Sequence, residues 1–198
     1  DRYTFSGQYL QIPSPPEGGE RRKDWFNIIH RAELPSDVSF EMYIDGAYTK
    51  DTRNDPTGIQ ISGKSGDNLY IFKSIDKYLE MPELKNFVTS FVQSCGVPIS
   101  QILVEPKASG KSLVQLLRRE TRYNVSEIKT NFVRYSKIER ARASSPFIEG
   151  GRVFLVKDNW NDAFLQQVST FPNAKHDEHI DVTSYAIERN LINNFFVV

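Results

Sequence analysis

The segment SFEMYIDGAYT, residues 39–49, constrains the fold of this chain more than any other. Phe40, Met42 and Ile44 occupy every second position, which is the period of a β-strand with one buried face. The pattern ends in Asp45, which a glycine follows. An acid at the end of an apolar strand, beside a glycine that leaves room for a ligand, is unusual at a purely structural position. Asp-Gly is also among the commonest hairpin dipeptides, so the segment alone is equally consistent with a turn.

Composition limits the classes of protein to which the chain can belong. Its 198 residues suffice for one large domain, and its 25 basic and 25 acidic residues give a net charge of zero. Any binding to nucleic acid would therefore depend on a local basic face. The single Cys95 excludes a disulfide framework and a cysteine-rich zinc site, and it suits a reducing compartment. No apolar run is long enough to span a membrane, and we expect no signal peptide.

The ends of the chain differ in composition from its centre. The chain starts with Asp1 instead of an initiator methionine, so we interpret it as excised from a longer protein. Residues 1–24 are expected to be a linker, because IPSPPEGG at residues 12–19 is rich in residues that break helices and strands. The main domain is predicted over residues 25–190, followed by an apolar tail at residues 191–198.

The order of the predicted elements defines the fold class. Short apolar stretches predict further strands near residues 25–29, 59–61, 69–72, 102–104, 124–128 and 153–156. Helical spacing of apolar residues predicts helices over residues 82–95, from Gly110 onward, over 137–145 up to Pro146, over 161–169 and over about 176–190. A meander of three strands followed by alternating helices and strands predicts an α/β fold. Its mixed central sheet combines a three-stranded antiparallel meander with parallel strands and is flanked by helices.

Two segments have the form of a phosphate-binding P-loop but lack its structural context. Residues 58–65, GIQISGKS, match the pattern, yet the predicted strand lies inside the motif and Gly-Asp-Asn follows where a helix should begin. A second GKS, at residues 110–112, has Glu105 in place of the first glycine. We therefore expect no ATP site in this chain.

Acidic residues recur where an apolar strand ends or a helix begins. Asp45 and Glu105 each end a predicted strand, and Asp177 and Asp181 lie four residues apart on one face of the last predicted helix. The helix dipole alone accounts for acids at a helix N-terminus, although for Asp181 less well than for Asp177. The alternative is a carboxylate cluster for Mg²⁺ or Mn²⁺. Two such ions about 4 Å apart activate a water and stabilise the leaving oxygen in phosphodiester cleavage.

A transition-metal site is a second alternative for the same region. His176 and His179, together with Asp177 or Asp181, could bind zinc or a related ion. The whole chain holds only three histidines, so few nitrogen ligands are available to such a site.

Four segments resemble the C-terminal nuclease domain of the phage terminase large subunit of the prophage type. They are YIDGAYT, ILVEPKASGKSLVQLLR, SKIERARASSPFIEGGRVFL and FPNAKHDEHIDVTSYAI. The resemblance extends from about residue 8 to residue 188. It implies a ribonuclease H-like fold and a two-metal endonuclease site that uses Mg²⁺ or Mn²⁺ to cut concatemeric double-stranded DNA during packaging.

The resemblance also implies roles for individual acids. By motif, Asp45 is the metal ligand of the first strand, Glu105 is the acid of the fourth strand and Asp177 is the helix ligand, and these three are catalytic. Asp181 is a further metal ligand or a supporting acid. Glu178 stands where the family usually has the second aspartate of an HDD run, so its role is open.

The remaining predictions concern the basic residues that contact DNA and the partners of the chain. Lys107 and Ser109 are candidates for holding a phosphate, and Lys137, Arg140 and Arg142 are candidates for contacts to the DNA backbone. A solvated surface explains each of them equally well. The resemblance implies double-stranded DNA, an upstream ATPase motor domain, a portal and a small terminase subunit as partners. It also implies a location in the cytoplasm of the bacterial host, away from membranes.

Two other functions remain open from the residues alone. The same fold serves cleavage of RNA–DNA hybrids and resolution of Holliday junctions. The apolar tail is also consistent with a non-catalytic module that docks on a portal or a small subunit.

Overall fold

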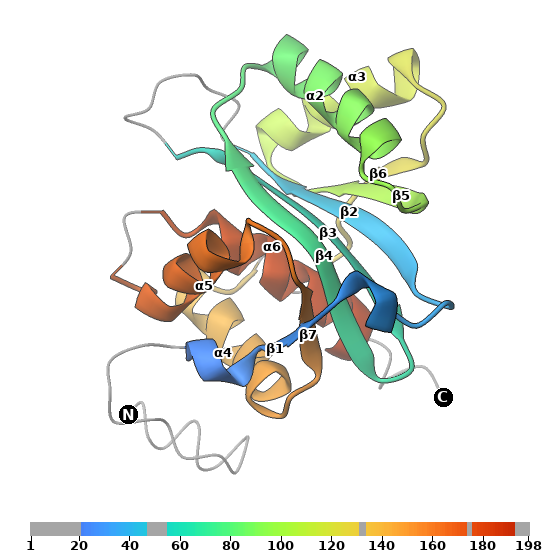
Figure 1. The fold of residues 1–198 in the computed structure, drawn as a ribbon. Coiled ribbons are helices and arrows are strands. Elements are labelled where there is room, and N and C mark those ends of the chain that lie inside the picture. Colours follow the sequence, from blue (N-terminus) through green and yellow to red (C-terminus); the bar gives the residue numbers. More distant parts are fainter. Residues whose placement is uncertain (1–20, 47–54, 131–133, 174–175, 193–198) are drawn as a thin grey trace.

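The structure is a computed structural model in which residues 21–46, 55–130, 134–173 and 176–192 are described (Figure 1). The side chains of residues 108 and 109 lie outside this description. Most of the predicted linker, the end of the 39–49 segment, the tail beyond residue 192 and the side chain of Ser109 therefore fall outside the described residues.

A mixed sheet of seven strands forms the centre of the described structure. The strand order is β1-β7-β4-β3-β2-β5-β6. β2, β3 and β4 form an antiparallel meander, and the pairs β1–β7, β4–β7, β2–β5 and β5–β6 are parallel. This arrangement confirms the predicted sheet. The strands are β1 (Asn27–Ile29), β2 (Ser39–Asp45), β3 (Thr57–Ser65), β4 (Asn68–Lys77), β5 (Ile99–Val104), β6 (Val125–Glu127) and β7 (Val153–Val156).

Helices cover both faces of the sheet, as Figure 1 shows. The helices of one face are α2 (Met81–Ser94) and α3 (Ala108–Glu120). The helices of the other face are α4 (Lys137–Glu149), α5 (Asn161–Thr170) and α6 (Glu178–Ile187). Short turns of helix complete the fold at η2 (Lys23–Trp25), η3 (Arg31–Glu33) and the π-helical η5 (Glu188–Ile192).

The residues of β2 are buried on both faces because helices lie above and below the strand. Met42 and Ile44 pack into the core under α2 and α3, whereas Tyr43 packs into the core under α4, α5 and α6. The alternation in the sequence therefore separates two cores, one on each side of the sheet.

Helix α4 continues through Pro146 to Glu149, so the prediction that Pro146 ends it is wrong. Ser136 and Glu139 form a capping box that starts the helix firmly. Proline removes one backbone hydrogen bond, and the full burial of Ile148 in the final turn offsets part of that loss. The helix ends at Gly150, before Gly151 adopts a positive φ of 70°.

The last predicted helix, residues 176–190, is shorter at both ends than expected. Regular α-helix begins at Glu178 and ends at Ile187, after which the backbone follows a π-helix to Ile192. Asp177 is therefore the N-cap residue of α6, and His176 precedes the helix.

Candidate active site

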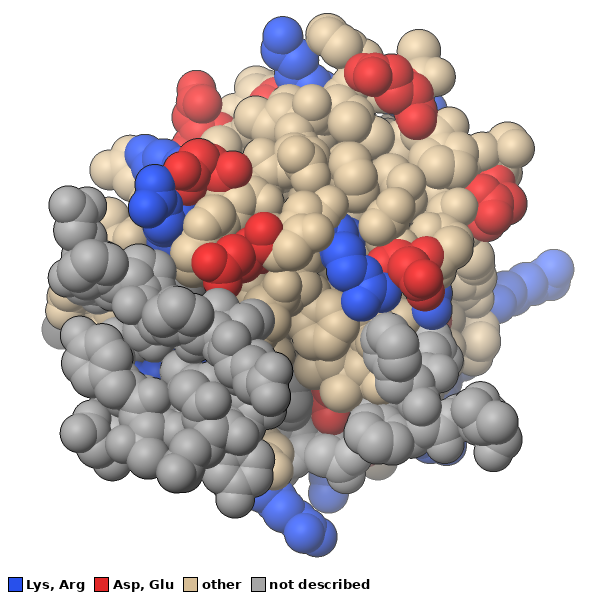
Figure 2. All heavy atoms as spheres, turned by 90° about the horizontal axis from the view of Figure 1, so that it is seen from below, with Lys and Arg blue, Asp and Glu red and all other residues tan. Residues whose placement is uncertain are grey.

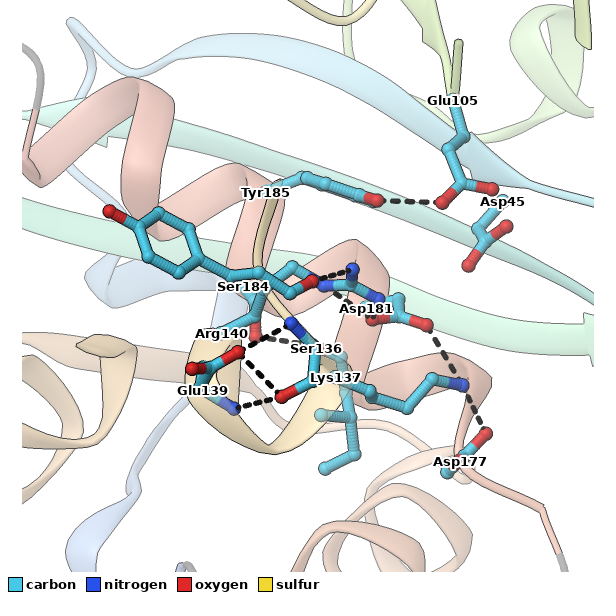
Figure 3. Close-up of polar contacts among 12 residues, drawn as sticks. Asp45, Glu105, Ser136, Lys137, Glu139, Arg140, Asp177, Asp181, Ser184 and Tyr185 are labelled. Carbon is cyan, nitrogen blue, oxygen red and sulfur yellow. Dashed lines mark hydrogen bonds and ion pairs between the residues drawn. The ribbon is translucent and has the colours of Figure 1, made fainter. Parts of the chain in front are cut away.

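Asp45 and Glu105 lie side by side because they end two neighbouring parallel strands. The register of β2 against β5 pairs Ile44 with Val104, and the Glu105 amide donates a 2.9 Å hydrogen bond to the Ile44 carbonyl. The two acids therefore leave the same edge of the sheet, and both are buried. Figure 3 shows their side chains close to each other. The ambiguity of Asp45 between a turn and a strand end is resolved, because it is the last residue of β2.

The turn after Glu105 is tight and requires a glycine. Gly110, in the first turn of α3, approaches the Glu105 backbone so closely that a Cβ there would lie 2.1 Å from the Glu105 carbonyl oxygen. Gly110 thus allows α3 to begin directly beneath the acid.

Two side chains hold the carboxylate of Glu105. The Tyr185 hydroxyl of α6 donates a 2.6 Å hydrogen bond to Oε1 (Figure 3), and Lys107 Nζ lies 2.6 Å from Oε2. Lys107 also lies 3.4 Å from Oδ1 of Asp45, so its ammonium spans the two acids. Tyr185 was not predicted, although it lies four residues after Asp181, on the same helix face.

Asp181 is the third acid of the cluster. Its side chain is 1% exposed, and its charge helps to raise the pKa of Asp45. Arg140 donates to Oδ1 of Asp181 through Nε, at 3.0 Å, and through Nη2, and Lys137 Nζ lies 2.8 Å from Oδ2. We call Asp45, Glu105 and Asp181 the acid cluster.

Asp177 lies at the solvent side of this arrangement. It is 29% exposed and pairs with the ammonium of Lys137, which connects it to Asp181, as Figure 3 shows. Asp45 and Glu105 therefore lie side by side, and Asp181 lies close enough for its charge to act on Asp45, whereas Asp177 is linked to Asp181 through Lys137.

The predicted DNA-binding residues occupy different positions. Lys107 is 59% exposed beside the acid cluster, and Lys137 is half-buried between two acids. Arg140 is only 11% exposed and is engaged by Asp181, so it serves as an internal counter-charge. Arg142 lies on α4 near Glu139, apart from the acid cluster.

The electrostatics of the cluster follow from burying like charges together. Burial, followed by the hydrogen bond and the charge of Glu105, raises the pKa of Asp45 well above its usual value. Burial also acts to raise the pKa of Glu105, but hydrogen bonds from Asp45, Lys107 and Tyr185 outweigh it and lower that pKa. Asp45 therefore holds a proton more tightly than Glu105 does.

This donor set fits a hard divalent cation. Carboxylate oxygens are the ligands that Mg²⁺ and Mn²⁺ prefer, and a bound cation displaces the proton from such a pair. Oε2 of Glu105 is buried, and its ion pair is with Lys107, whose side chain is largely exposed. A divalent ion can therefore take the place of that ammonium at Oε2.

His176 and His179 do not come together as the predicted zinc site requires. His179 is buried, its Nδ1 shares a 2.9 Å hydrogen bond with the Ser74 hydroxyl, and its ring packs against Phe164. Burial lowers the pKa of His179 to about 4, so the ring is neutral. His179 is therefore a core residue, and it does not share ligands with His176.

The surface carries both signs of charge. Figure 2 shows one face on which lysine and arginine side chains alternate with aspartate and glutamate.

No helix in the described part of the chain has the length and apolar character needed to cross a membrane.

The sheet is mixed, and acids lie at the ends of two neighbouring strands and on a helix that covers the sheet. These features define a ribonuclease H-like domain with a carboxylate cluster. The sequence matches the family described as Terminase RNaseH-like domain over residues 42–190, and the chain belongs to this family. The predicted family and fold class are thereby confirmed.

Solved structures of terminases share the fold at low sequence identity. The large terminase of a thermophilic bacteriophage is 15% identical, with a TM-score of 0.65 over 95% of this chain and 51% of that chain. The chain thus spans about half the length of that protein. The nuclease of the thermophilic phage G20c with bound magnesium is 10% identical, with a TM-score of 0.61 over 89% of this chain and 100% of that chain.

The nuclease domain of the bacteriophage SPP1 large terminase, with bound manganese, is 15% identical, with a TM-score of 0.56 over 85% of this chain and 98% of that chain. No curated protein sequence matches the chain significantly.

Proposed function

We propose that this domain is a divalent-metal-dependent endonuclease that hydrolyses phosphodiester bonds of concatemeric double-stranded DNA for a viral packaging terminase. The observation that supports the proposal is the acid cluster, in which the buried carboxyl groups of Asp45 and Glu105 lie side by side at two strand ends and the charge of the buried Asp181 acts on Asp45 from α6. The magnesium and manganese bound by the G20c and SPP1 nucleases support the choice of cation.

The acids of the cluster would hold the cations. Asp45 would bind at the centre, Glu105 on the side of β5 and Asp181 on the side of α6, with Asp177 at the solvent edge. Two divalent ions bound there would activate a water and stabilise the leaving oxygen of the scissile phosphate. Tyr185 would keep Glu105 in one orientation, and Arg140 would do the same for Asp181.

Lysines at the solvent edge would contact the substrate. Lys107 is the best placed, because its exposed ammonium lies within 3.4 Å of both strand-end acids. As cations neutralise these acids, the ammonium becomes available to a phosphate oxygen. Because the net charge is zero, we expect the domain alone to bind DNA weakly and to rely on an upstream ATPase motor, a portal and a small subunit.

The test is plasmid cleavage with Mg²⁺ or Mn²⁺ by the parent and by Asp45→Asn, Glu105→Gln and Asp181→Asn. Each change should lower the rate by about 1,000-fold, because metal catalysis supplies several kcal/mol. Asp162→Asn, an exposed acid on α5, is the matched control and should cut like the parent. Equal cleavage by all variants would place the active site elsewhere.

Substrate choice distinguishes this proposal from the other functions of the fold. The parent should cut linear duplex DNA in preference to an RNA–DNA hybrid or a four-way junction. A preference for either of those two substrates would assign the domain to a different nuclease class. Absence of both cleavage and stabilisation by Mn²⁺ would favour a docking module.

A further inference from the structure

We propose that Asp55, His176 and Glu178 form a separate binding site for one first-row transition-metal ion, such as Zn²⁺, beside the start of α6. One ligand atom from each residue lies within 4.8 Å of the other two. None of the three residues belongs to the acid cluster. We call them the histidine site.

Glu178 presents a buried oxygen that has no hydrogen-bond partner. Its side chain is 5% exposed, and Oε1 makes no hydrogen bond. Gln167 Nε2 donates to the other oxygen, Oε2, at 3.4 Å, so only Oε1 remains open. Leaving a carboxylate oxygen buried and unpaired is costly, and a bound cation removes that cost.

His176 presents a matching nitrogen. Its Nδ1 is buried without a hydrogen-bond partner and lies 3.8 Å from Oε1 of Glu178, too far for a hydrogen bond. An ion about 2.1 Å from each atom would bridge a gap of this size. Nε2 of His176 lies 3.5 Å from the Tyr78 hydroxyl, and a proton on Nε2 leaves the Nδ1 lone pair directed at the ion. Such outer partners usually orient a metal-binding histidine.

Close packing holds the histidine site together. A Cβ on Gly58 of β3 would lie 2.9 Å from Cβ of Glu178, so the start of α6 lies directly on this strand. Asp55 precedes the same strand by two residues and is exposed. The site therefore combines one buried, one half-buried and one exposed ligand, which leaves its solvent side open to water.

The ligand types select the metal. An imidazole nitrogen with two carboxylates suits Zn²⁺, Mn²⁺ or Co²⁺, whereas Mg²⁺ prefers oxygen ligands alone. Because Asp177 lies between His176 and Glu178 in the chain, an ion here would fix the backbone on both sides of Asp177.

The test uses the triple variant Asp45→Asn, Glu105→Gln, Asp181→Asn, so that the acid cluster no longer binds cations. After treatment with a chelator, this variant is titrated with Zn²⁺ by calorimetry and with Co²⁺ by visible absorption. We expect one equivalent to bind, with cobalt bands typical of nitrogen ligation. Adding His176→Gln or Glu178→Gln should weaken binding by about 10- to 100-fold or more.

The chain provides a matched control and two ways to overturn the proposal. His30→Gln changes an exposed histidine far from the site in sequence and should leave the titration unchanged. Absence of Zn²⁺ binding to the triple variant would refute the site, as would unchanged binding after His176→Gln. Thermal melting checks that each variant is folded. Because the assay needs no cleavage, its outcome is independent of the proposed nuclease activity.

Discussion

The Tyr185 hydroxyl of α6 donates a 2.6 Å hydrogen bond to Oε1 of Glu105 at the end of β5. This contact joins the helix that carries Asp181 to the strand end that carries the second acid. Burial, with the charge of Glu105, raises the pKa of Tyr185, so the hydroxyl remains a donor at any ordinary pH.

Tyr185→Phe should therefore weaken catalysis without removing a metal ligand. We expect plasmid cleavage to slow by about 10- to 100-fold and the affinity for Mn²⁺ to fall, because Glu105 loses its orientation. Tyr43→Phe is the matched control, since the buried Tyr43 hydroxyl donates a 2.7 Å bond to Glu41, outside the acid cluster. Equal loss of cleavage in both variants would show that Tyr185 contributes only to the stability of the fold.

Arg140→Met should destabilise the fold. The change leaves the buried Asp181 with Lys137 as its remaining basic partner, and removing one member of a buried pair costs about 3 kcal/mol. Urea denaturation in the presence of a chelator measures the loss. Arg119→Met is the control, because its pair with Glu120 is exposed to solvent and should contribute little to stability. Similar losses in both variants would contradict the buried pairing.

Glu178 should make the metal-free protein less stable as the pH rises. Burial raises the pKa of Glu178 to about 7, above its usual value of 4.5. Between these values the folded state binds more protons than the unfolded state, so the free energy of unfolding falls with increasing pH. The total decrease is at most about 3 kcal/mol.

Chemical denaturation between pH 4.5 and 8, with a chelator present, tests this dependence. Glu178→Gln should remove this part of the pH dependence and be more stable than the parent at pH 8. Glu149→Gln, an exposed acid at the end of α4, should retain the behaviour of the parent. If the parent instead gained stability with increasing pH relative to Glu178→Gln, the predicted direction of the pH dependence would be wrong.

Gly110→Ala should disturb the active site through the backbone. The added methyl group would lie 2.1 Å from the Glu105 carbonyl oxygen, so α3 must shift and carry Glu105 with it. We expect a loss of about 1–3 kcal/mol of stability and a marked loss of cleavage. Ser112→Ala, an exposed position on the same helix, should be neutral in both assays.

Local patterns in the sequence predicted most of the elements and the position of two acids at strand ends. The alternation of Phe40, Met42 and Ile44 predicted β2, and the acid that ends it lies at the end of that strand. The run ILV before Glu105 predicted β5 in the same way. Local patterns succeed here because period and burial depend on near neighbours.

Such local patterns did not predict the contacts between segments that are distant in the sequence. Asp177 was predicted as the helix ligand and Asp181 as a further or supporting acid, yet Asp181 is the more deeply buried of the two and is paired with Arg140 of α4. The sequence did not predict this pairing, because the two residues lie 41 positions apart in the chain. His176 pairs with Glu178 and Asp55, whereas sequence spacing had suggested His179.

Most strands and helices, and the family, could be predicted from consecutive residues, because hydrophobic period and motif spacing are local properties. The pairing of charges could not be predicted in this way, because it depends on tertiary packing. The cost of burying a charge depends on which partner lies opposite it, and that partner is set by how strands pair and helices pack. The acid cluster, its internal lysine and arginine, and the histidine site all follow from that packing.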